Sequence, residues 1–344
     1  MYDFIIIGGG SVGMYLAIKL REKGRNVLIL EKKKNQEKKI CSGLVSGNFF
    51  DFFPRNACLL QKEFLSARIW IEDKKFDFKG KAYLFEREDI NSYLFKKVKE
   101  VGVEIKRGKE AIKIEEKDNF VSVLTRSNEK FSGKVLAGCD GASSLVARQA
   151  KMPEFKRFLL GTIFYTKQEI CEKEKDFPEL FFGKNFPGFF GWRIPRKNCI
   201  EYGTALFPEE NPEKKLKDFF KKRIKNFKDP LDLHSAIIPV FPRKRVCSKR
   251  IFLCGDAAGQ IKSYTGGGLV YSFFSAKIAA NVLDPNNIDL SLYEKEWRKE
   301  LMKDIRLGSF IRKCYNTPAF IQKVALLFLK TKNNLDQDRP SSVF

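Results

Sequence analysis

The pattern of apolar and polar residues in the first thirty positions predicts a strand, a helix and a second strand. Residues 3–7 form a short apolar run. Apolar residues then recur at helical spacing from Val12 to Leu20, and a second apolar run at 26–30 follows Gly24. Apolar positions three or four apart indicate one buried face of a helix, and short apolar runs between glycines indicate buried strands. The pattern therefore predicts a βαβ unit at the start of the chain.

Between residues 64 and 154 the period of the pattern changes several times. Alternation at 64–79 around a polar turn at 72–75 predicts a β-hairpin. Residues 85–100 predict a helix with Ile90, Leu94 and Val98 on one face. A further helix is expected from Ser143 onward. Strands joined by polar turns are expected at 103–107, 111–115, 120–125 and 134–138.

The segment from 155 to 245 has a different character, because aromatic residues are dense and strand-like alternation recurs. Residues 214–227 are amphipathic and predict one helix, with Leu216, Phe219 and Phe220 on its apolar stripe. We interpret this segment as a mostly antiparallel substrate domain with one covering helix. Most of its aromatic residues must form a core, although their excess also suits a long apolar binding channel.

The remaining segments predict helices after one more strand. A strand is expected at 250–254, and the small and apolar residues to about Val282 predict the helix that follows it. Residues 289–330 are expected to be helical, with a final apolar stretch at 319–329 that packs on the body or lies at a membrane surface, and we favour packing. The polar tail 333–344 is expected to be loose. We divide the chain into a discontinuous nucleotide domain (1–62, 80–154 and 246–284), a substrate domain (63–79 and 155–245) and a C-terminal helical region (285–344).

Gly8, Gly10 and Gly13 have the G-x-G-x-x-G spacing of a dinucleotide-binding turn, and they stand between the first strand and its helix. Gly8 permits the tight turn, Gly10 lets the backbone approach a pyrophosphate, and Gly13 lets helix and strand pack closely. Glu31 ends the second strand and can accept hydrogen bonds from a ribose. Because strand, helix and acid are in register, we predict dinucleotide binding over an ordinary glycine-rich turn.

Two later turns each place an aspartate after a strand. Asp140 matches a second nucleotide-contacting turn, and the alternative is an ordinary strand–helix junction that Asp140 caps. Asp256 is placed to bind the ribityl hydroxyls of a flavin. The glycines at 266–268 precede a helix whose positive end would face the flavin pyrimidine ring and favour the anionic reduced form.

The excess of basic residues bears on which binding partners the protein could have. The 344 residues suffice for about two domains, and 65 Lys and Arg against 42 Asp and Glu give a formal net charge of +23. One interpretation is a basic field that attracts anionic lipid, a phosphorylated substrate or an acidic protein. We favour composition bias, because basic residues are spread along the chain. No nucleic-acid-binding module accompanies the charge, so nucleic acid is not an expected partner.

Other features limit the location and the chemistry. No apolar run approaches the length of about 18 residues that spans a bilayer, and the N-terminus does not resemble a signal peptide, so we expect a cytoplasmic protein. The eight cysteines contain no C-x-x-C pair, and the single histidine, His234, offers no metal-ligand cluster. No metal is therefore expected, and histidine-based acid–base chemistry is close to excluded.

The motifs together resemble a known class of flavoenzyme. The glycine motif with Glu31, the Asp140 turn and the Asp256 turn resemble FAD-dependent enzymes of the aromatic-hydroxylase and glutathione-reductase-like class. The Cys-Ser-Gly run at 41–43 is similar to the cysteine–glycine loop of the geranylgeranyl reductase family, and residues 187–196 resemble that family's P-x-x-Y-x-W-x-F-P-K motif. The resemblance covers residues 1 to about 300. It implies an α/β fold in which a Rossmann-like FAD-binding domain is joined to an antiparallel β-rich substrate domain and C-terminal helices.

The resemblance also implies FAD as cofactor and a set of contact residues. Arg87 would lie near the pyrophosphate or the flavin, and the alternative for it is a surface charge at a helix start. The implied substrate contacts are Phe190, Trp192, Pro195 and Arg196. The implied FAD contacts, with those that the turns add, are Gly8, Gly10, Val12, Gly13, Glu31, Cys41, Gly43, Arg87, Ala111, Asp140, Asp256, Gly267, Gly268 and Leu269.

Three positions depart from the family motif. Phe190 replaces the tyrosine, Ile194 the phenylalanine and Arg196 the lysine. The tyrosine hydroxyl is lost, which puts any role for it in doubt. An aromatic wall remains, and Arg196 keeps a cation that could hold phosphate in bidentate fashion.

The activity implied by the resemblance is reduction of isoprenoid double bonds by reduced FAD, with an archaeal-type digeranylgeranyl glycerophospholipid as the favoured substrate. Cys41 is the candidate proton donor, and packing beside the isoalloxazine ring is the equally weighted alternative. An FAD-dependent monooxygenase or halogenase, and a non-enzymatic flavoprotein that binds isoprenoid lipid or shuttles electrons, stay open because the fold alone does not decide. The electron donor is expected to be NAD(P)H or an acidic ferredoxin docked on the basic surface. A lipid substrate also suits peripheral contact with the inner membrane surface.

Overall fold

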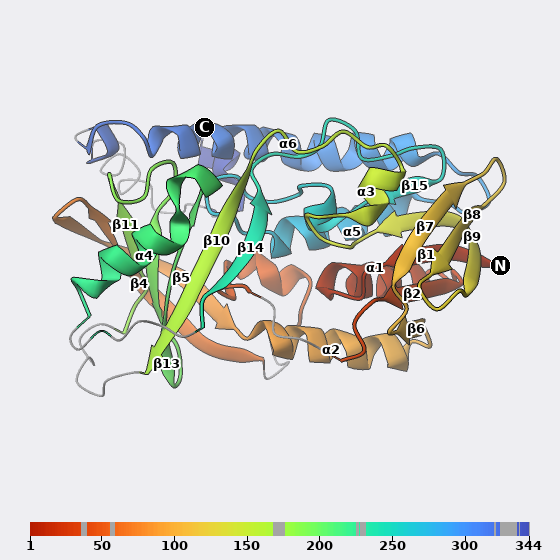
Figure 1. Cartoon of the computed structure of the whole chain (residues 1–344), viewed down its shortest axis with the longest axis horizontal. Helices are drawn as coiled ribbons and strands as arrows, with labels where there is room; N and C mark the ends of the chain where they lie inside the picture. Colours follow the sequence, from red (N-terminus) through yellow and green to blue (C-terminus); the bar gives the residue numbers. More distant parts are fainter. Residues whose placement is uncertain are drawn as a thin grey trace.

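The computed structural model describes residues 1–35, 40–55, 59–167, 176–224, 227, 232–319, 321–323, 336 and 338–343. Two β-sheets with helices packed around them form an elongated body (Figure 1). A seven-stranded sheet lies at the end of the body that contains the N-terminus, and an eight-stranded sheet forms the other end.

The seven-stranded sheet is parallel at its centre. β1 pairs in parallel with β2 and β9, β6 pairs in parallel with β2, and β15 pairs in parallel with β9. β7 and β8 continue the sheet as an antiparallel pair beside β9. The central strands are buried along nearly their whole length, as expected for a parallel sheet that helices cover on both faces. The spatial order is β6 (Glu104–Arg107), β2 (Val27–Glu31), β1 (Tyr2–Ile7), β9 (Lys130–Gly138), β8 (Val121–Thr125) and β7 (Ala111–Glu116), with β15 (Ile251–Leu253) beside β9.

Helices from distant parts of the sequence cover this sheet. α1 (Ser11–Arg21) packs against both α2 (Arg87–Glu100) and α5 (Leu269–Val282), and α6 (Leu290–Cys314) packs on α5. In Figure 1, α6 runs along the top of the body and α2 along the bottom. The short helix α3 (Leu145–Gln149) lies beside β7. Among the described residues, none of the helices combines the length and the apolar character needed to cross a bilayer.

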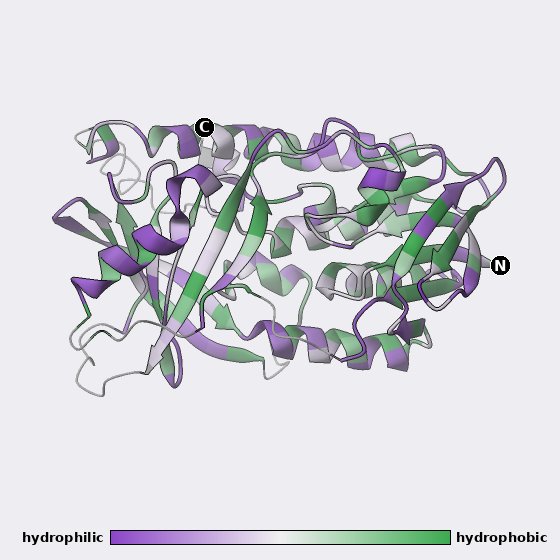
Figure 2. Cartoon of the chain, in the orientation of Figure 1, coloured by the Kyte–Doolittle hydropathy of each residue, from purple (hydrophilic) through white to green (hydrophobic). Residues whose placement is uncertain are grey.

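The eight-stranded sheet is antiparallel except where β11 pairs with β4. α4 (Pro212–Lys221) covers it by packing on β10 and β13, and it buries Leu216, Phe219 and Phe220. The outward side of α4 is hydrophilic (Figure 2). The spatial order is β14 (His234–Pro239), β10 (Phe158–Lys167), β13 (Cys199–Leu206), β12 (Gly191–Pro195), β11 (Glu179–Phe182), β4 (Leu60–Ile71), β5 (Lys74–Phe85) and β3 (Leu44–Val45).

The structure confirms the predicted fold class, and it moves the limits of some elements. The hairpin β4–β5 runs from 60 to 85 and not only over 64–79, because register shifts near Leu60 and Phe64 interrupt the alternation that the prediction used. α4 begins at Pro212 because the side chain of Asn211 caps it by accepting from the backbone N–H of Lys214. α4 ends at Lys221, and residues 225 and 226 of the expected helix lie outside the described residues.

The expectation of a loose C-terminal tail is wrong for the described part of it. Asp338 is buried, and the backbone N–H of Ser341 donates to Asp304 on α6 over 2.8 Å. A short 3-10 helix, η5 (Pro340–Val343), packs on α6. These contacts are polar, so a hydropathy pattern could not reveal them. Of the apolar stretch expected at 319–329, residues 320 and 324–329 lie outside the described residues.

Candidate active site

A cavity of about 2320 Å³ is lined by residues of both sheets. Typical ligand pockets measure about 300–1,000 Å³, so this cavity has room for a large cofactor together with a long substrate. One part of the lining consists of glycines and charged side chains from the seven-stranded sheet and its turns. The eight-stranded sheet supplies an apolar part of the lining, with Ile69, Leu180, Phe182, Trp192 and Ile194 and the neighbouring Phe190, and its strand β5 (Lys74–Phe85) adds Asp77, Lys79 and Lys81.

The glycine turn after β1 is packed so tightly that side chains are excluded. Gly8 has φ +105°, and a Cβ there would lie 2.4 Å from the carbonyl oxygen of Cys139. A Cβ on Gly13 would lie 2.0 Å from the carbonyl oxygen of Gly8, so close packing of α1 on the turn requires glycine there. Gly10 is the N-cap of α1 and makes no side-chain cap, and it lines the cavity with Val12. The start of α1 therefore presents backbone N–H groups to an anion in the cavity.

Glu31 ends β2 at the edge of the cavity, next to the glycine turn. Its carboxylate accepts a hydrogen bond from the backbone N–H of Gly9 over 2.6 Å and one from that of Lys33 over 2.9 Å. These two bonds fix the carboxylate, and its further acceptor positions suit ribose hydroxyls. Ala111, the first residue of β7, also lines the cavity.

Two arginines bring buried donors to the cavity. Arg87 is the first residue of α2, and Arg107 ends β6. Both side chains line the cavity, and the Nε atom of each is buried without a hydrogen-bond partner. Buried donors without acceptors are costly, so these atoms fit a bound anion such as a pyrophosphate. Sequence reasoning missed Arg107, although its place at the end of a parallel strand beside Glu31 was a usable signal.

Asp140 follows β9 and has two neighbours that hold its carboxylate. It accepts from the hydroxyl of Ser144 over 2.6 Å and from the backbone N–H of Val146 over 3.1 Å. Burial raises the pKa of Asp140. Asp140 thus braces the start of α3, although the N-cap of that helix is Ser144 and not Asp140, and it also lines the cavity.

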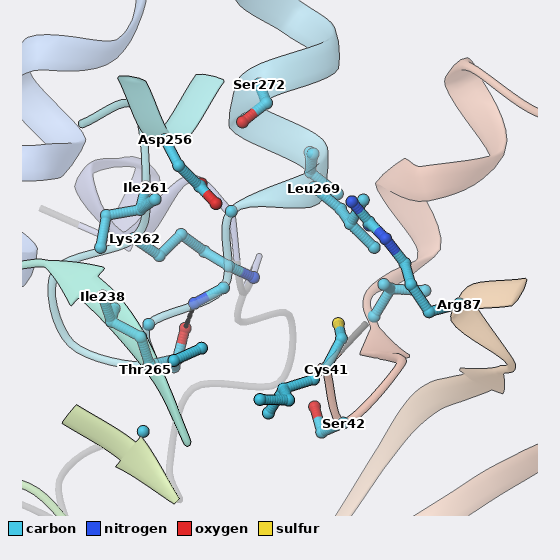
Figure 3. Close-up of a pocket in the computed structure, with 18 of the residues that line it drawn as sticks. Cys41, Ser42, Arg87, Ile238, Asp256, Ile261, Lys262, Thr265, Leu269 and Ser272 are labelled. Carbon is cyan, nitrogen blue, oxygen red and sulfur yellow. Dashed lines mark hydrogen bonds between the residues drawn. The ribbon is translucent and has the colours of Figure 1, made fainter. Parts of the chain in front are cut away.

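The start of α5 forms the opposite wall. Gly267, Gly268 and Leu269 line the cavity, and Gly268 is an N-cap that provides no side-chain hydrogen bond. A Cβ on Gly268 would lie 2.9 Å from Oδ1 of Asp256, so the aspartate is held against the helix start. Figure 3 shows Asp256, Lys262 and Thr265 on one side of the open space, with Cys41 and Arg87 on the other. Sequence reasoning missed Lys262.

The loop formed by residues 40–43, called the Cys41 loop below, borders the cavity beside α2. Cys41 is half-buried, lines the cavity and accepts a hydrogen bond from the backbone N–H of Gly43 at 3.4 Å. Gly43, which the resemblance places among the FAD contacts, is not among the residues that line the cavity. Its φ is +67°, and a Cβ would lie 1.9 Å from the carbonyl oxygen of Phe85, so glycine is needed for packing on the end of β5.

Of the residues expected to contact substrate, Phe190 and Trp192 line the apolar part of the cavity, whereas Pro195 and Arg196 do not. The indole Nε1 of Trp192 donates to Glu201 over 2.8 Å. This bond fixes the ring in the cavity wall. Phe190 packs with its ring centroid 6.2 Å from that of Trp192.

Arg196 does not offer a cation to a phosphate, contrary to expectation. Its guanidinium forms ion pairs with Glu201 at 2.7 Å and Glu86 at 2.9 Å, and it donates to the carbonyl oxygen of Ser42 over 2.6 Å. Burial works against its charge, but the attraction of Glu201 and Glu86 raises the pKa of Arg196. Arg196 therefore ties the Cys41 loop and the start of α2 to the sheet that holds Trp192.

The residues present fit FAD. Two helix starts without side-chain caps, two buried arginine donors and the fixed carboxylate of Glu31 line the cavity that could receive a dinucleotide. Two family profiles match the chain: one described as an FAD binding domain covers residues 73–272, and one described as pyridine nucleotide-disulphide oxidoreductase covers residues 5–139.

Individual proteins are similar over nearly the whole chain. Digeranylgeranylglycerophospholipid reductase 2 of Methanothermobacter thermautotrophicus is 28% identical, with 91% of this chain and 87% of that protein covered. The chloroplastic geranylgeranyl diphosphate reductase of Arabidopsis thaliana is 23% identical, with 90% and 73% covered. A crystal structure of a geranylgeranyl bacteriochlorophyll reductase-like protein from Thermoplasma acidophilum has a TM-score of 0.83 at 17% identity, with 98% of this chain and 93% of that chain covered.

Proposed function

We propose that this chain, which belongs to the FAD-binding domain family and is an FAD-dependent oxidoreductase of the geranylgeranyl reductase type, hydrogenates digeranylgeranyl glycerophospholipid. The observation that carries this proposal is one cavity that contains both an anion-binding part and a part lined by apolar side chains. The anion-binding part fits the pyrophosphate of FAD, and the apolar part fits the isoprenoid chains of a lipid. The similarity to digeranylgeranylglycerophospholipid reductase 2 supports the same substrate class.

An isolated alkene is a poor hydride acceptor, so the site must hold the double bond in position, exclude water and supply a proton to it. Bound FAD supplies the hydride chemistry. The apolar side chains of β4, β11 and β12 hold the isoprenoid chain and keep water from it. The ring of Trp192, fixed by Glu201, offers an aromatic face to positive charge that develops on the alkene.

Cys41 is the proposed proton donor. Its thiol lines the cavity where the Cys41 loop meets α2, and Figure 3 shows its sulfur directed toward the open space. A neutral thiol can give a proton to the second alkene carbon and regain it from solvent. Arg196 holds the carbonyl oxygen of the next residue, Ser42, and so fixes the loop that carries the thiol.

The test is to incubate dithionite-reduced protein with the unsaturated lipid without air and to follow the lipid mass. We expect the mass to rise in steps, each equal to the hydrogens added to one double bond. Reduced FAD that leaves the lipid mass unchanged would contradict the proposal and favour a binding or electron-shuttling protein. Oxygen added to the lipid in air would favour a monooxygenase. Running the assay with geranylgeranyl diphosphate as well separates the two substrate classes.

A matched pair of cysteine variants tests the proton donor. Cys41→Ala should retain FAD but lose at least tenfold in the rate of alkene reduction, because general acid catalysis contributes about 100-fold or more. Cys199→Ala is the control, since Cys199 lies at the start of β13 and is not among the cavity-lining residues. Full turnover in Cys41→Ala would remove the acid role and leave packing.

The electron donor and the place of action complete the proposal. NAD(P)H and reduced ferredoxin are the two donors to compare, by the rate at which each reduces the bound FAD.

The lipid substrate resides in a membrane, so we propose peripheral contact with the membrane surface. Cosedimentation with vesicles of anionic phospholipid measures that contact, and its loss in high salt would show that basic residues contribute.

A further inference from the structure

A buried ion pair joins the cavity to the C-terminal segment. Lys262 lies in the loop between η4 (Gly255–Ala257) and α5 and is 9% exposed. Its Nζ lies 2.7 Å from Oδ1 of Asp338, which is 2% exposed. The two opposite charges form a buried ion pair, in which each charge offsets part of the cost of burying the other.

Asp338 is held from several sides. The hydroxyl of Ser46 donates to its other carboxylate oxygen, and the hydroxyl of Tyr271 on α5 donates to its backbone carbonyl over 2.7 Å. The next residue, Arg339, donates to the backbone carbonyl of Glu300 on α6 over 2.6 Å. The carboxylate therefore stands at a fixed place in the wall behind Lys262.

Lys262 is bonded to the glycine turn that starts α5. Its backbone N–H donates to the carbonyl oxygen of Gly267 over 2.9 Å, and its carbonyl accepts from Gly266 over 2.8 Å. Its side chain lies against the same turn, since a Cβ on Gly267 would meet the Cε of Lys262 at 2.9 Å. Lys262 lines the cavity, and Figure 3 shows it extending into the open space between Asp256 and Thr265. The full charge of the ammonium thus adds to the partial positive charge of the helix start.

We propose that Lys262 is the cation that stabilises the anionic reduced form of the flavin, and that Asp338, brought by the C-terminal segment, sets how strongly it acts. The proposal rests on the proposed function only in placing the flavin ring at the start of α5. A unit charge near the pyrimidine ring in a site of low dielectric favours the reduced anion over the neutral oxidised ring. Asp338 opposes this effect in part, because its negative charge is paired with the same ammonium.

The test measures the reduction potential of bound FAD in three proteins without lipid. Lys262→Met should bind reduced FAD at least tenfold less tightly relative to oxidised FAD, which is a shift of about 30 mV to more negative potential for a two-electron couple. Asp338→Asn should shift the potential in the opposite direction. Lys134→Met is the control, since Lys134 pairs with Asp3 on the outer end of the seven-stranded sheet. Equal potentials in Lys262→Met and the unaltered protein would overturn the proposal.

A second measurement guards against variants that disturb the fold. The absorption spectrum of reduced FAD reports whether the ring is anionic or neutral, and titration gives the pH at which it takes up a proton. We expect that pH to rise in Lys262→Met relative to Lys262→Arg, which keeps the charge. Identical titrations in these two variants would overturn the proposal. Neither measurement uses the lipid, so failure of lipid hydrogenation leaves both results interpretable.

Discussion

At the scale of single residues, Gly43 shows how a backbone requirement can serve a site that the residue itself does not line. Gly43→Ala places a methyl group 1.9 Å from the carbonyl oxygen of Phe85, at a φ of +67°. The Cys41 loop must then move away from β5. We expect a loss of stability well above the roughly 1–2 kcal/mol that left-handed backbone alone costs an alanine, together with at least tenfold weaker FAD binding. Urea unfolding and FAD titration measure the two effects.

Gly24→Ala is the matched control for this prediction. Gly24 also has positive φ, at +76°, but a Cβ there meets nothing within 4 Å. The Gly24→Ala substitution should therefore lower the free energy of unfolding by only about 1–2 kcal/mol and leave FAD binding unchanged. If the two variants behaved alike, the close approach of Gly43 to Phe85 would have no consequence for the site.

Arg87 carries a second prediction at this scale. Its Nε is buried at the cavity without a protein partner, so we assign its guanidinium to the bound cofactor. Loss of a charge-assisted hydrogen bond costs about 1.5–3 kcal/mol, which is roughly 10- to 150-fold in affinity. Arg87→Met should weaken FAD binding by that factor, as measured by equilibrium dialysis. Arg157→Met removes an exposed arginine paired with Glu209 and should leave the affinity unchanged. Unaltered affinity in Arg87→Met would return Arg87 to the role of a surface charge.

At the scale of elements, one guanidinium joins β12, β13, the start of α2 and the Cys41 loop. Arg196→Met leaves Glu201, which is 0% exposed, without its cation. Breaking a buried pair in this way costs about 3–5 kcal/mol. Burial already raises the pKa of Glu201, so the uncompensated carboxylate is the source of the cost. The double variant Arg196→Met with Glu201→Gln should regain most of that loss in urea unfolding. A double variant no more stable than the single one would show that packing, and not charge, was lost.

A hydrogen bond across the seven-stranded sheet gives a pH prediction. The hydroxyl of Tyr2 on β1 donates to Glu104 on β6 over 2.7 Å. Burial, with this bond, raises the pKa of Tyr2 to about 12 from 10.0. The native state therefore holds the tyrosine proton more tightly than the unfolded state does. The resulting stabilisation is fully present below pH 10 and is lost as the pH rises toward 12.

Tyr2→Phe removes the titrating group and tests this sign. The free energy of unfolding of the variant should fall less steeply between pH 10 and 12 than that of the unaltered protein. Between about pH 7 and 9, where neither Tyr2 nor its acceptor Glu104 titrates, the difference between the two proteins should be constant. Parallel curves across the whole range would show that Tyr2 titrates alike in the folded and unfolded states.

At the scale of the whole molecule, the features that the sequence predicts are those that depend on the local pattern of apolar and polar residues. The strands and helices around the glycine turn have strong periodicity, and the structure confirms them. The contact between Gly43 and Phe85 joins residues far apart in sequence, so the glycine was noticed but its partner was not. Arg196 was assigned to phosphate because its acidic partners, Glu86 and Glu201, cannot be recognised before the chain is folded. The tail was expected to be loose because it is polar, and the burial of Asp338 follows from its partners Lys262 and Ser46, which are far away in the sequence.

The cavity is bounded by both sheets, so occupation by FAD should stabilise the whole body and not one half of it. A ligand that binds only the native state adds RT ln(1 + [L]/Kd) to the free energy of unfolding. This term is about 2.7 kcal/mol at a ligand concentration of 100 times Kd, and it grows by about 1.4 kcal/mol for each further tenfold increase in concentration. Removal of FAD should lower the free energy of unfolding by this amount. Unfolding is best followed in parallel by flavin absorbance and by the fluorescence of Trp192 with the other tryptophans replaced. Both signals should shift together with FAD concentration, because Trp192 lies in the cavity wall. A Trp192 transition that ignored FAD would mean that the cofactor stabilises the seven-stranded sheet alone, and the wall of the proposed substrate channel would then be independent of the flavin.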